Sequence, residues 1–427
     1  MLGRRPPAVL ALGVTVAILL AIAFYGHFNF YRDPGSIFFN PNRALERKYS
    51  IQREQEAVAF EAQAHALLDG NENADGVFPK AGRDPLICGV FVTMGRETQG
   101  GVHPLELAVA SSLTGLVEPE RSDIDLQVYF ANTNASEHPL WNSWLLKLVD
   151  GFTSARQLVS DSEFKNLVKL ENGKEFFTKS AFDFRNAIRH CYNVSSAPYI
   201  ALLEGDILLA DGWFSRSKLA LQDIVAQTKS MDRWLDMRLF NDEKGIGYDS
   251  TTLFGNNVPI IILGVSITLF TILQATRVYS ATGKAFISNA FISVICCVTV
   301  PLFVIMFFQT GKSSVFTPAP GVSVQNWGCC SQAIIMPRER AIGLAELIAE
   351  QAGGPPDMSI NDYASRNELK RFVLNPVQVQ HIGFRSLLTP ERLKTESVWS
   401  VAFEDLDPGK LANEHKKMAE QLYGPLS

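Results

Sequence analysis

Three stretches of the chain contain no charged residue and are each long enough to cross a membrane as a helix. Ala8–Tyr25 and Val258–Ala275 each have 18 residues, and Ala285–Phe308 has 24. A bilayer core takes about 20 helical residues, with about 17 as the lower limit. The alternative for the second and third stretches is a hairpin buried in a soluble core. Runs such as Phe303–Phe308 show no polar face, so the sequence predicts three membrane spans.

Basic residues flank these stretches on one side of the membrane. Arg4 and Arg5 precede the first stretch, which lacks a small-residue cleavage pattern and indicates an uncleaved signal anchor. The loop 276–284 carries Arg277 and Lys284 and no acidic residue, so this loop and the N-terminus are expected in the cytosol. The predicted parts are a cytosolic N-terminus (1–7), a signal anchor (8–25), a stem with a helix (26–84), the first part of a lumenal domain (85–257), a transmembrane hairpin (258–308), and the second part of the lumenal domain with the C-terminal tail (309–427).

Charge and cysteine usage narrow the function classes. The net charge is -5 and no dense basic patch occurs, which argues against a nucleic-acid partner. Four of the six cysteines lie in the predicted lumenal part, where disulfides can form, and three pairings are open: Cys88, Cys191, Cys329 and Cys330. Two glycosylation sequons, at Asn134 and Asn193, lie in the same part of the chain.

The predicted lumenal part begins with the pattern of a βαβ unit. An apolar strand at 85–93, a helix at 105–116 and a strand at 124–131 favour an α/β sheet. Ligands of such sheets bind beyond the carboxyl ends of the strands, where Arg96 could meet a phosphate or be an ordinary surface arginine. A further strand and turn are expected at 164–172. The helix expected at 43–68 has the composition of a solvated stalk.

Two carboxylates follow a buried strand in the middle of the chain. The apolar run Tyr199–Leu203 leads into Glu204-Gly205-Asp206, and positions i and i+2 of a strand share a face. Carboxylates gathered at a strand end suit a hard divalent cation that keeps open positions for phosphate oxygens. The alternative is a strand that ends in a solvated polar turn. An alternating strand at 376–383 contains His381, which alone would more often be structural.

These motifs together resemble a known family. The segments LLEGD, DGWF, RLFNDEKGIG, WGCCSQA and VQHIG resemble a GT-A nucleotide-sugar glycosyltransferase. With the hairpin between the acidic motif and the C-terminal half, the chain resembles the post-GPI-attachment-to-proteins N-acetylgalactosamine transferase family. The resemblance implies an α/β, GT-A-like domain with a mixed sheet, interrupted by a two-helix transmembrane hairpin and preceded by a signal-anchor helix. The family has Glu-Asp-Asp at the acidic triplet, whereas this chain has Gly205 in the middle.

The resemblance also implies an activity and its partners. The expected reaction is transfer of a GalNAc-like sugar from a UDP-sugar to a mannose of a GPI-anchor glycan, with inversion and assistance from Mn²⁺ or another divalent cation. The expected acceptors are GPI-anchored proteins or GPI glycolipids, and the expected location is the Golgi membrane. Alternatives are a Golgi transferase acting on N-glycans and a non-catalytic membrane protein with a degraded acidic motif.

Candidate site residues follow from the motifs and the resemblance. The metal ligands are expected to be Glu204, Asp206 and His381. The general base is expected among Asp211, Asp242 and Glu243, with Glu243 preferred because it lies in the acceptor-side segment. Donor-binding candidates are Arg96, Asp183, Arg189 and Glu204, although Asp183 and Arg189 could also belong to the charged solvent face of the helix 182–191.

Overall fold

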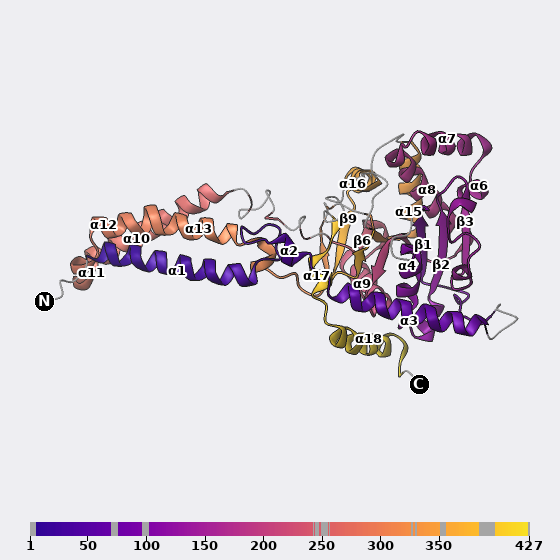
Figure 1. The fold of residues 1–427 in the computed structure, drawn as a ribbon. Helices are drawn as coiled ribbons and strands as arrows, with labels where there is room; N and C mark the ends of the chain where they lie inside the picture. The colour runs from indigo at the N-terminus through magenta and orange to yellow at the C-terminus, as the bar shows by residue number, and fades with distance from the viewer. Residues whose placement is uncertain are drawn as a thin grey trace. The chain divides into compact units, whose positions relative to one another are not determined.

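The computed structural model divides the chain into two compact units. The membrane unit comprises Met1–Glu46 and Glu243–Pro318, and the sheet unit comprises Arg47–Asp242 and Ala319–Ser427. The structure describes residues 6–69, 76–95, 102–241, 243, 247–248, 255, 257–325, 328, 331–350, 356–383 and 398–425. Figure 1 shows the fold.

Among its described residues, the membrane unit contains three helices that are long and apolar enough to cross a membrane. They cover Pro7–Asn29, Val258–Tyr279 and Asn289–Gln309, and each contains most of one uncharged stretch of the sequence. The helices of this unit are α1 (Pro7–Asn29), α2 (Pro41–Ala44), α10 (Val258–Tyr279), α11 (Ala281–Phe286), α12 (Asn289–Val294), η5 (Ile295–Thr299), α13 (Val300–Gln309) and α14 (Lys312–Val315).

The third of these helices changes its winding in the middle. The segment η5 is a π-helix that ends just before Pro301, which has no N–H to donate to the preceding turn. Ser266 Oγ on α10 donates to the carbonyl oxygen of Cys296 in η5 at 2.9 Å. The hydroxyl oxygens of Thr15 on α1 and Thr299 lie 2.9 Å apart. One hydrogen bond from a hydroxyl to a carbonyl, and one between two hydroxyls, therefore join α10 and α1 to η5.

The core of the sheet unit is an eight-stranded sheet in the order β3-β2-β1-β4-β8-β6-β9-β7. Strands β1 to β4 are parallel to one another, and β8 runs antiparallel to both β4 and β6. A second, two-stranded sheet pairs β5 with β10. The prediction of an α/β fold with a mixed sheet is confirmed. The strands are β1 (Ile87–Thr93), β2 (Ile124–Phe130), β3 (Gly151–Ser154), β4 (Tyr199–Glu204), β5 (Ile207–Leu209), β6 (Trp234–Arg238), β7 (Gly321–Val324), β8 (Ala333–Pro337), β9 (Lys370–Asn375) and β10 (Val379–His381).

Helices cover both faces of the large sheet. Apolar side chains of α4 and α9 pack on one face, and those of α8, α15 and α16 pack on the other. The helices of this unit are α3 (Tyr49–Asp69), α4 (Pro104–Leu113), α5 (Glu118–Ser122), η1 (Ala135–Glu137), η2 (Trp144–Lys147), α6 (Ala155–Leu158), α7 (Asp161–Asn172), α8 (Phe176–Val194), α9 (Trp213–Thr228), η3 (Met231–Arg233), α15 (Arg338–Glu350), α16 (Pro356–Arg366), α17 (Val401–Glu404) and α18 (Pro408–Tyr423).

Two segments differ from the sequence prediction. The strand expected at 164–172 is wrong, because this segment lies in helix α7, which begins at the N-cap Ser160 and buries Leu167 and Leu170 three residues apart. Helix α3, expected as a solvated stalk, packs on α4 and β5. Its Arg53 is almost fully buried and donates from Nε to the carbonyl of Leu209 at 2.8 Å. The stem helix is therefore part of the sheet unit.

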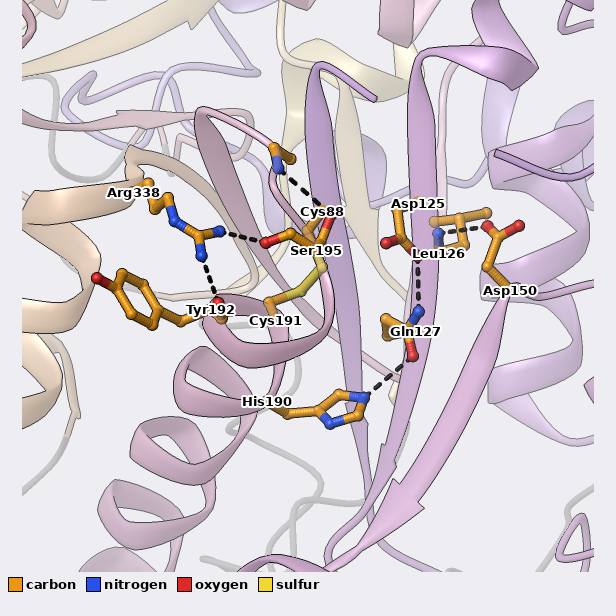
Figure 2. The surroundings of a disulfide bond; sticks show 11 residues. Cys88, Asp125, Leu126, Gln127, Asp150, His190, Cys191, Tyr192, Ser195 and Arg338 are labelled. Atoms are coloured by element: carbon orange, nitrogen blue, oxygen red, sulfur yellow. Dashed lines mark hydrogen bonds between the residues drawn. A yellow bond between two sulfur atoms is a disulfide. The ribbon is translucent and has the colours of Figure 1, made fainter. Parts of the chain in front are cut away.

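The beginnings of the parallel strands, which we call the amino end of the sheet, are held by cross-links (Figure 2). Cys88 at the start of β1 forms a disulfide with Cys191 near the end of α8, which settles one of the open pairings. Arg338 donates to the carbonyls of Ser195, at 2.5 Å, and Tyr192. The disulfide and these hydrogen bonds therefore fix α8 to the amino end of the sheet. The other two cysteines of the predicted lumenal part, Cys329 and Cys330, lie outside the described residues.

Candidate functional site

The acidic motif forms a turn at the opposite end of the sheet, where the parallel strands finish, which we call the carboxyl end. Strand β4 ends at Glu204. The next two residues, Gly205 and Asp206, make the turn, and β5 follows them. Three backbone hydrogen bonds hold it: Glu204 N–H to Gln332 O (2.8 Å), Gly205 N–H to Val92 O (2.9 Å) and Ile382 N–H to Asp206 O (2.8 Å). Neighbouring strand ends thus fix the turn on three sides.

Glu204, Asp206 and His381 come together at this turn. Antiparallel pairing of β10 with β5 sets His381 opposite Ile207, the residue after Asp206. One potential ligand atom from each of Glu204, Asp206 and His381 lies within 4.8 Å of the others. His381 Nε2 is 3.4 Å from Asp206 Oδ2, and Ser331 Oγ donates to Glu204 Oε1 at 3.3 Å.

The donor set of this group fits a divalent cation. Ligands on opposite sides of a bound cation lie about 4 to 5 Å apart, given metal–oxygen distances of about 2.0 to 2.6 Å. Two carboxylates with one imidazole suit a hard divalent ion such as Mn²⁺ better than a soft one. Two carboxylates held this close also repel each other, and a cation between them would relieve that repulsion.

Gly205 packs tightly against the end of β1. A β-carbon at this position would lie 2.9 Å from Thr93 Cβ, 3.0 Å from Thr93 Oγ1 and 3.1 Å from Val92 O. Contacts this short leave no room for a side chain unless the backbone moves. The glycine is therefore what allows this close approach of β1 and the turn.

A buried histidine supports the same strand end. His138 Nδ1 accepts from the Leu140 N–H at 3.1 Å, so Nε2 carries the proton and donates to Thr93 Oγ1 at 3.0 Å. Burial, together with the neighbouring His103, lowers the pKa of His138 to about 3. Gly95 N–H donates to Asn132 Oδ1 at 2.7 Å. Sequence reasoning missed His138, although its position shortly after a predicted strand was a signal.

Asp183 and Arg189, expected to bind the donor, take different places. Asp183 is buried and accepts from Lys179 Nζ at 2.8 Å and from the Tyr129 hydroxyl at 3.1 Å. Burial raises its pKa, against the opposing effect of Lys179. Lys179 also donates to the carbonyl of Ala131 at 2.5 Å, so this network holds the end of β2. Arg189 is exposed on α8.

One of the base candidates, Asp211, lies away from the acidic turn. Asp211 follows the far end of β5 and accepts from His415 Nδ1 at 2.9 Å. Burial would raise its pKa, but the hydrogen bond and charge of His415 outweigh burial and lower it. Glu243 is buried and belongs to the membrane unit. Asp242 and Arg96 lie outside the described residues.

Comparison with known proteins gives one family. A family model described as GPI-N-acetylgalactosamine transferase PGAP4 matches residues 87–380, more than half of the chain. No curated protein matches the chain. The matched range starts at the first residue of β1 and ends one residue before His381, so it contains the acidic turn.

Proposed function

The chain belongs to the GPI-N-acetylgalactosamine transferase PGAP4 family, and from this premise we propose that it moves GalNAc from a UDP-sugar to a mannose of a GPI glycan. Membership of this family indicates that the chain is a glycosyltransferase whose acceptor is a GPI glycan. The observation that carries the finer proposal is the group of Glu204, Asp206 and His381 at the carboxyl end of the sheet, where ligands of α/β sheets bind. We assign the sheet unit to the GT-A-like folds on the same ground.

In this proposal the acidic turn holds the diphosphate end of the donor. Glu204, Asp206 and His381 would hold a divalent cation, Mn²⁺ in our proposal, which would neutralise charge on the departing UDP. The turn keeps the two carboxylates in place through bonds to Gln332, Val92 and Ile382, so little reorganisation is required when the donor binds. Transfer with inversion then needs one group that accepts the proton of the attacking hydroxyl.

The membrane unit suits an acceptor that is anchored in lipid. A GPI glycan stays close to the bilayer, and an enzyme held on the same surface meets it at a raised effective concentration. The Cys88–Cys191 disulfide supports a lumenal sheet unit, because disulfides persist in oxidising compartments. The exposed sequon asparagines Asn134 and Asn193 support the same side. These features support a lumenal position, and our proposal puts the sheet unit in the Golgi lumen.

The test compares the Asp206→Ala variant with the unmodified protein, each as the full chain in lipid nanodiscs. Asp206→Ala should lower GalNAc transfer from UDP-GalNAc to a GPI acceptor on the order of 1,000-fold, since a cation's charge stabilisation is worth several kcal/mol. It should also abolish Mn²⁺-dependent binding of UDP. The matched control is Asp161→Ala, which removes an exposed carboxylate on α7. Unchanged transfer and unchanged UDP binding in Asp206→Ala would overturn the metal assignment.

A further inference from the structure

Helix α3 carries a carboxylate on its buried face. Glu61 lies one turn after Ala57 and three residues before Ala64, both of which are buried. Only 9% of Glu61 is exposed, whereas Glu54 on the same helix is partly exposed and pairs with Arg47. Burial of an ionisable side chain on an apolar helix face is costly, so such a residue needs a reason beyond stability.

The packing of α3 runs in step with α4 and β5. Near its start, Arg53 Nη2 donates to the carbonyl of Ser111 at 2.9 Å, and Arg53 Nε donates to that of Leu209. One turn later, Ala57 joins a small apolar cluster with members from α4, β5 and the segment after β10: Leu107, Ala110, Leu208 and Ile382. The helix therefore advances toward the beginning of β5, which is where the acidic turn lies.

The next turn of α3 brings Glu61 to the level of this turn. Four helical residues advance about 6 Å, and two residues of extended chain, from Leu208 back to Asp206, span about 7 Å. The residue that shares the apolar cluster with Ala57, Ile382, follows His381 directly. This spacing, together with the neighbouring Glu106 in the first turn of α4, puts Glu61 toward the end of the sheet unit where the acidic turn lies.

Glu61 lies near a second carboxylate, and one of the two carboxylate oxygens of Glu61 accepts no hydrogen bond from the described residues. Oε1 of Glu61 is buried and accepts no hydrogen bond from the described residues. Glu106, at the first turn of α4, accepts from the His103 N–H at 2.8 Å and repels a charge on Glu61. Burial, with the charge of Glu106, raises the pKa of Glu61 to about 7.

We propose that Glu61 accepts the proton of the acceptor hydroxyl during transfer. This inference rests on the proposed function. The acceptor O–H bond breaks and its proton goes to the Glu61 carboxylate, while the oxygen forms the new bond to the anomeric carbon. The bond from that carbon to the β-phosphate oxygen breaks, and its electron pair leaves with UDP. Glu61 fits the role because its buried oxygen is available and a base is most effective with a pKa near the working pH.

The groups that could shift this titration are few among the described residues. His103 and Glu106 lie at the start of α4, and strand β5 carries no titratable side chain. Glu404 on α17 packs at the other end of α3, where it accepts from Ser50 N–H at 3.1 Å. His65 follows Glu61 by one turn on α3 itself, and Asp206 and His381 are unchanged in every test variant.

The experiment uses full-length protein in nanodiscs with UDP-GalNAc and a GPI acceptor. Glu61→Gln should lower kcat by about 100- to 10,000-fold without changing Mn²⁺-dependent UDP binding. The rate of the unmodified enzyme should rise with pH through about 7, and Glu61→Gln should lack that rise. Glu61→Asp should recover part of the rate, and the control Glu54→Gln should match the unmodified enzyme. Glu243→Gln tests the competing base.

A second measurement does not depend on activity. The folded pKa of Glu61 lies above its unfolded value, so its contribution to stability is present at low pH and is lost as pH rises through about 7. Glu61→Gln should therefore raise the thermal midpoint at pH 8, relative to the unmodified protein, and leave it unchanged at pH 4.5. Retention of kcat within about 3-fold in Glu61→Gln, with the pH rise intact, would overturn the inference. Absence of GalNAc transfer by the unmodified enzyme would instead overturn the proposed function.

Discussion

The two ends of the large sheet differ in how their charged side chains are paired. At the amino end, opposite charges meet: Arg121 and Asp150 lie 3.0 Å apart, and His415 Nε2 lies 2.9 Å from Glu120. At the carboxyl end, Lys179 pairs with Asp183 at 2.8 Å, but at the acidic turn Glu204 lies close to Asp206, and Glu106 repels a charge on Glu61. Opposite charges relieve each other, whereas like charges cost stability. The amino end therefore stabilises the fold, and the carboxyl end keeps strain that a cation, a donor or a proton could relieve.

The difference extends to covalent bonds and to the C-terminal helix. The disulfide joins β1 to α8 at the amino end, and α18 is fixed there through His415. The acidic turn, in contrast, is held by backbone hydrogen bonds between strand ends and by the bond from Ser331 to Glu204. Changes at the amino end should thus affect stability first and transfer second, and changes at the carboxyl end should affect transfer directly.

Removing the disulfide should give the largest loss of stability. Cys88 and Cys191 are 103 residues apart, and closing a loop of that length restricts the unfolded chain strongly. Cys88→Ser with Cys191→Ser should lower the free energy of unfolding by about 4 kcal/mol. The measurement is thermal unfolding of purified protein with and without reductant. Reductant should lower the midpoint of the unmodified protein toward that of the variant and leave the variant unchanged.

Transfer by the folded fraction of this variant separates the two ends. At a temperature where the variant is folded, its kcat should stay within about 3-fold of the unmodified enzyme, because the acidic turn is held by other contacts. A loss of transfer as large as that in Asp206→Ala, with the variant still folded, would contradict the division of roles between the ends.

His415 should give the next effect, and it should depend on pH. Burial alone would lower the pKa of His415, but its bonds to Asp211 and Glu120 raise it to about 9. A raised pKa means that the stabilisation is complete below about pH 6.5 and is lost as pH rises through about 9. The shift corresponds to at most about 3 kcal/mol. His415→Gln should lower the thermal midpoint at pH 6 and converge with the unmodified protein near pH 10; a constant gap would contradict this assignment.

Local patterns in the sequence carried more information about the strands than about the site. The apolar run before Glu204 predicts β4, and Glu204 with Asp206 predicts converging carboxylates. In the sequence, Asp211 is close enough to the acidic motif to be a candidate site residue. Strand β5, however, separates Asp211 from Asp206, and Asp211 pairs with His415 instead. His381 was expected as the third ligand from the VQHIG motif and the family resemblance; spacing along the chain does not show the pairing of β10 with β5 that brings it to Asp206.

Glu61 shows the same limit in a helix. Charged residues early in the segment 43–68 suggested a solvated stalk. Because that prediction rested on the composition of the whole segment, it overlooked one carboxylate, Glu61, among apolar positions. The signal was present, because Glu61 shares a helix face with Ala57 and Ala64. Which partner covers that face is a tertiary fact, supplied by α4 and β5. A charged residue on the apolar stripe of a helix therefore deserves the same notice as an acidic motif at a strand end.

The smallest predicted effect on stability concerns Gly205. Adding one methyl group at Gly205, and one at Gly409 on α18, compares how tightly the two ends are packed. Gly205→Ala places a β-carbon 2.9 Å from Thr93 Cβ, so β1 or the turn must shift, at about 2 kcal/mol of stability. The shift moves Glu204 and Asp206, so transfer should fall by about 10-fold or more, beyond what the stability loss explains. The control is Gly409→Ala on α18, where the nearest atom is 3.4 Å away and alanine should be neutral or slightly stabilising. Gly205→Asp, which adds the middle carboxylate expected from the family resemblance, should suffer the same clash. Higher transfer by Gly205→Asp at undiminished stability would show that the space beside Thr93 opens readily, and that the carboxyl end is less tightly packed than its contacts indicate.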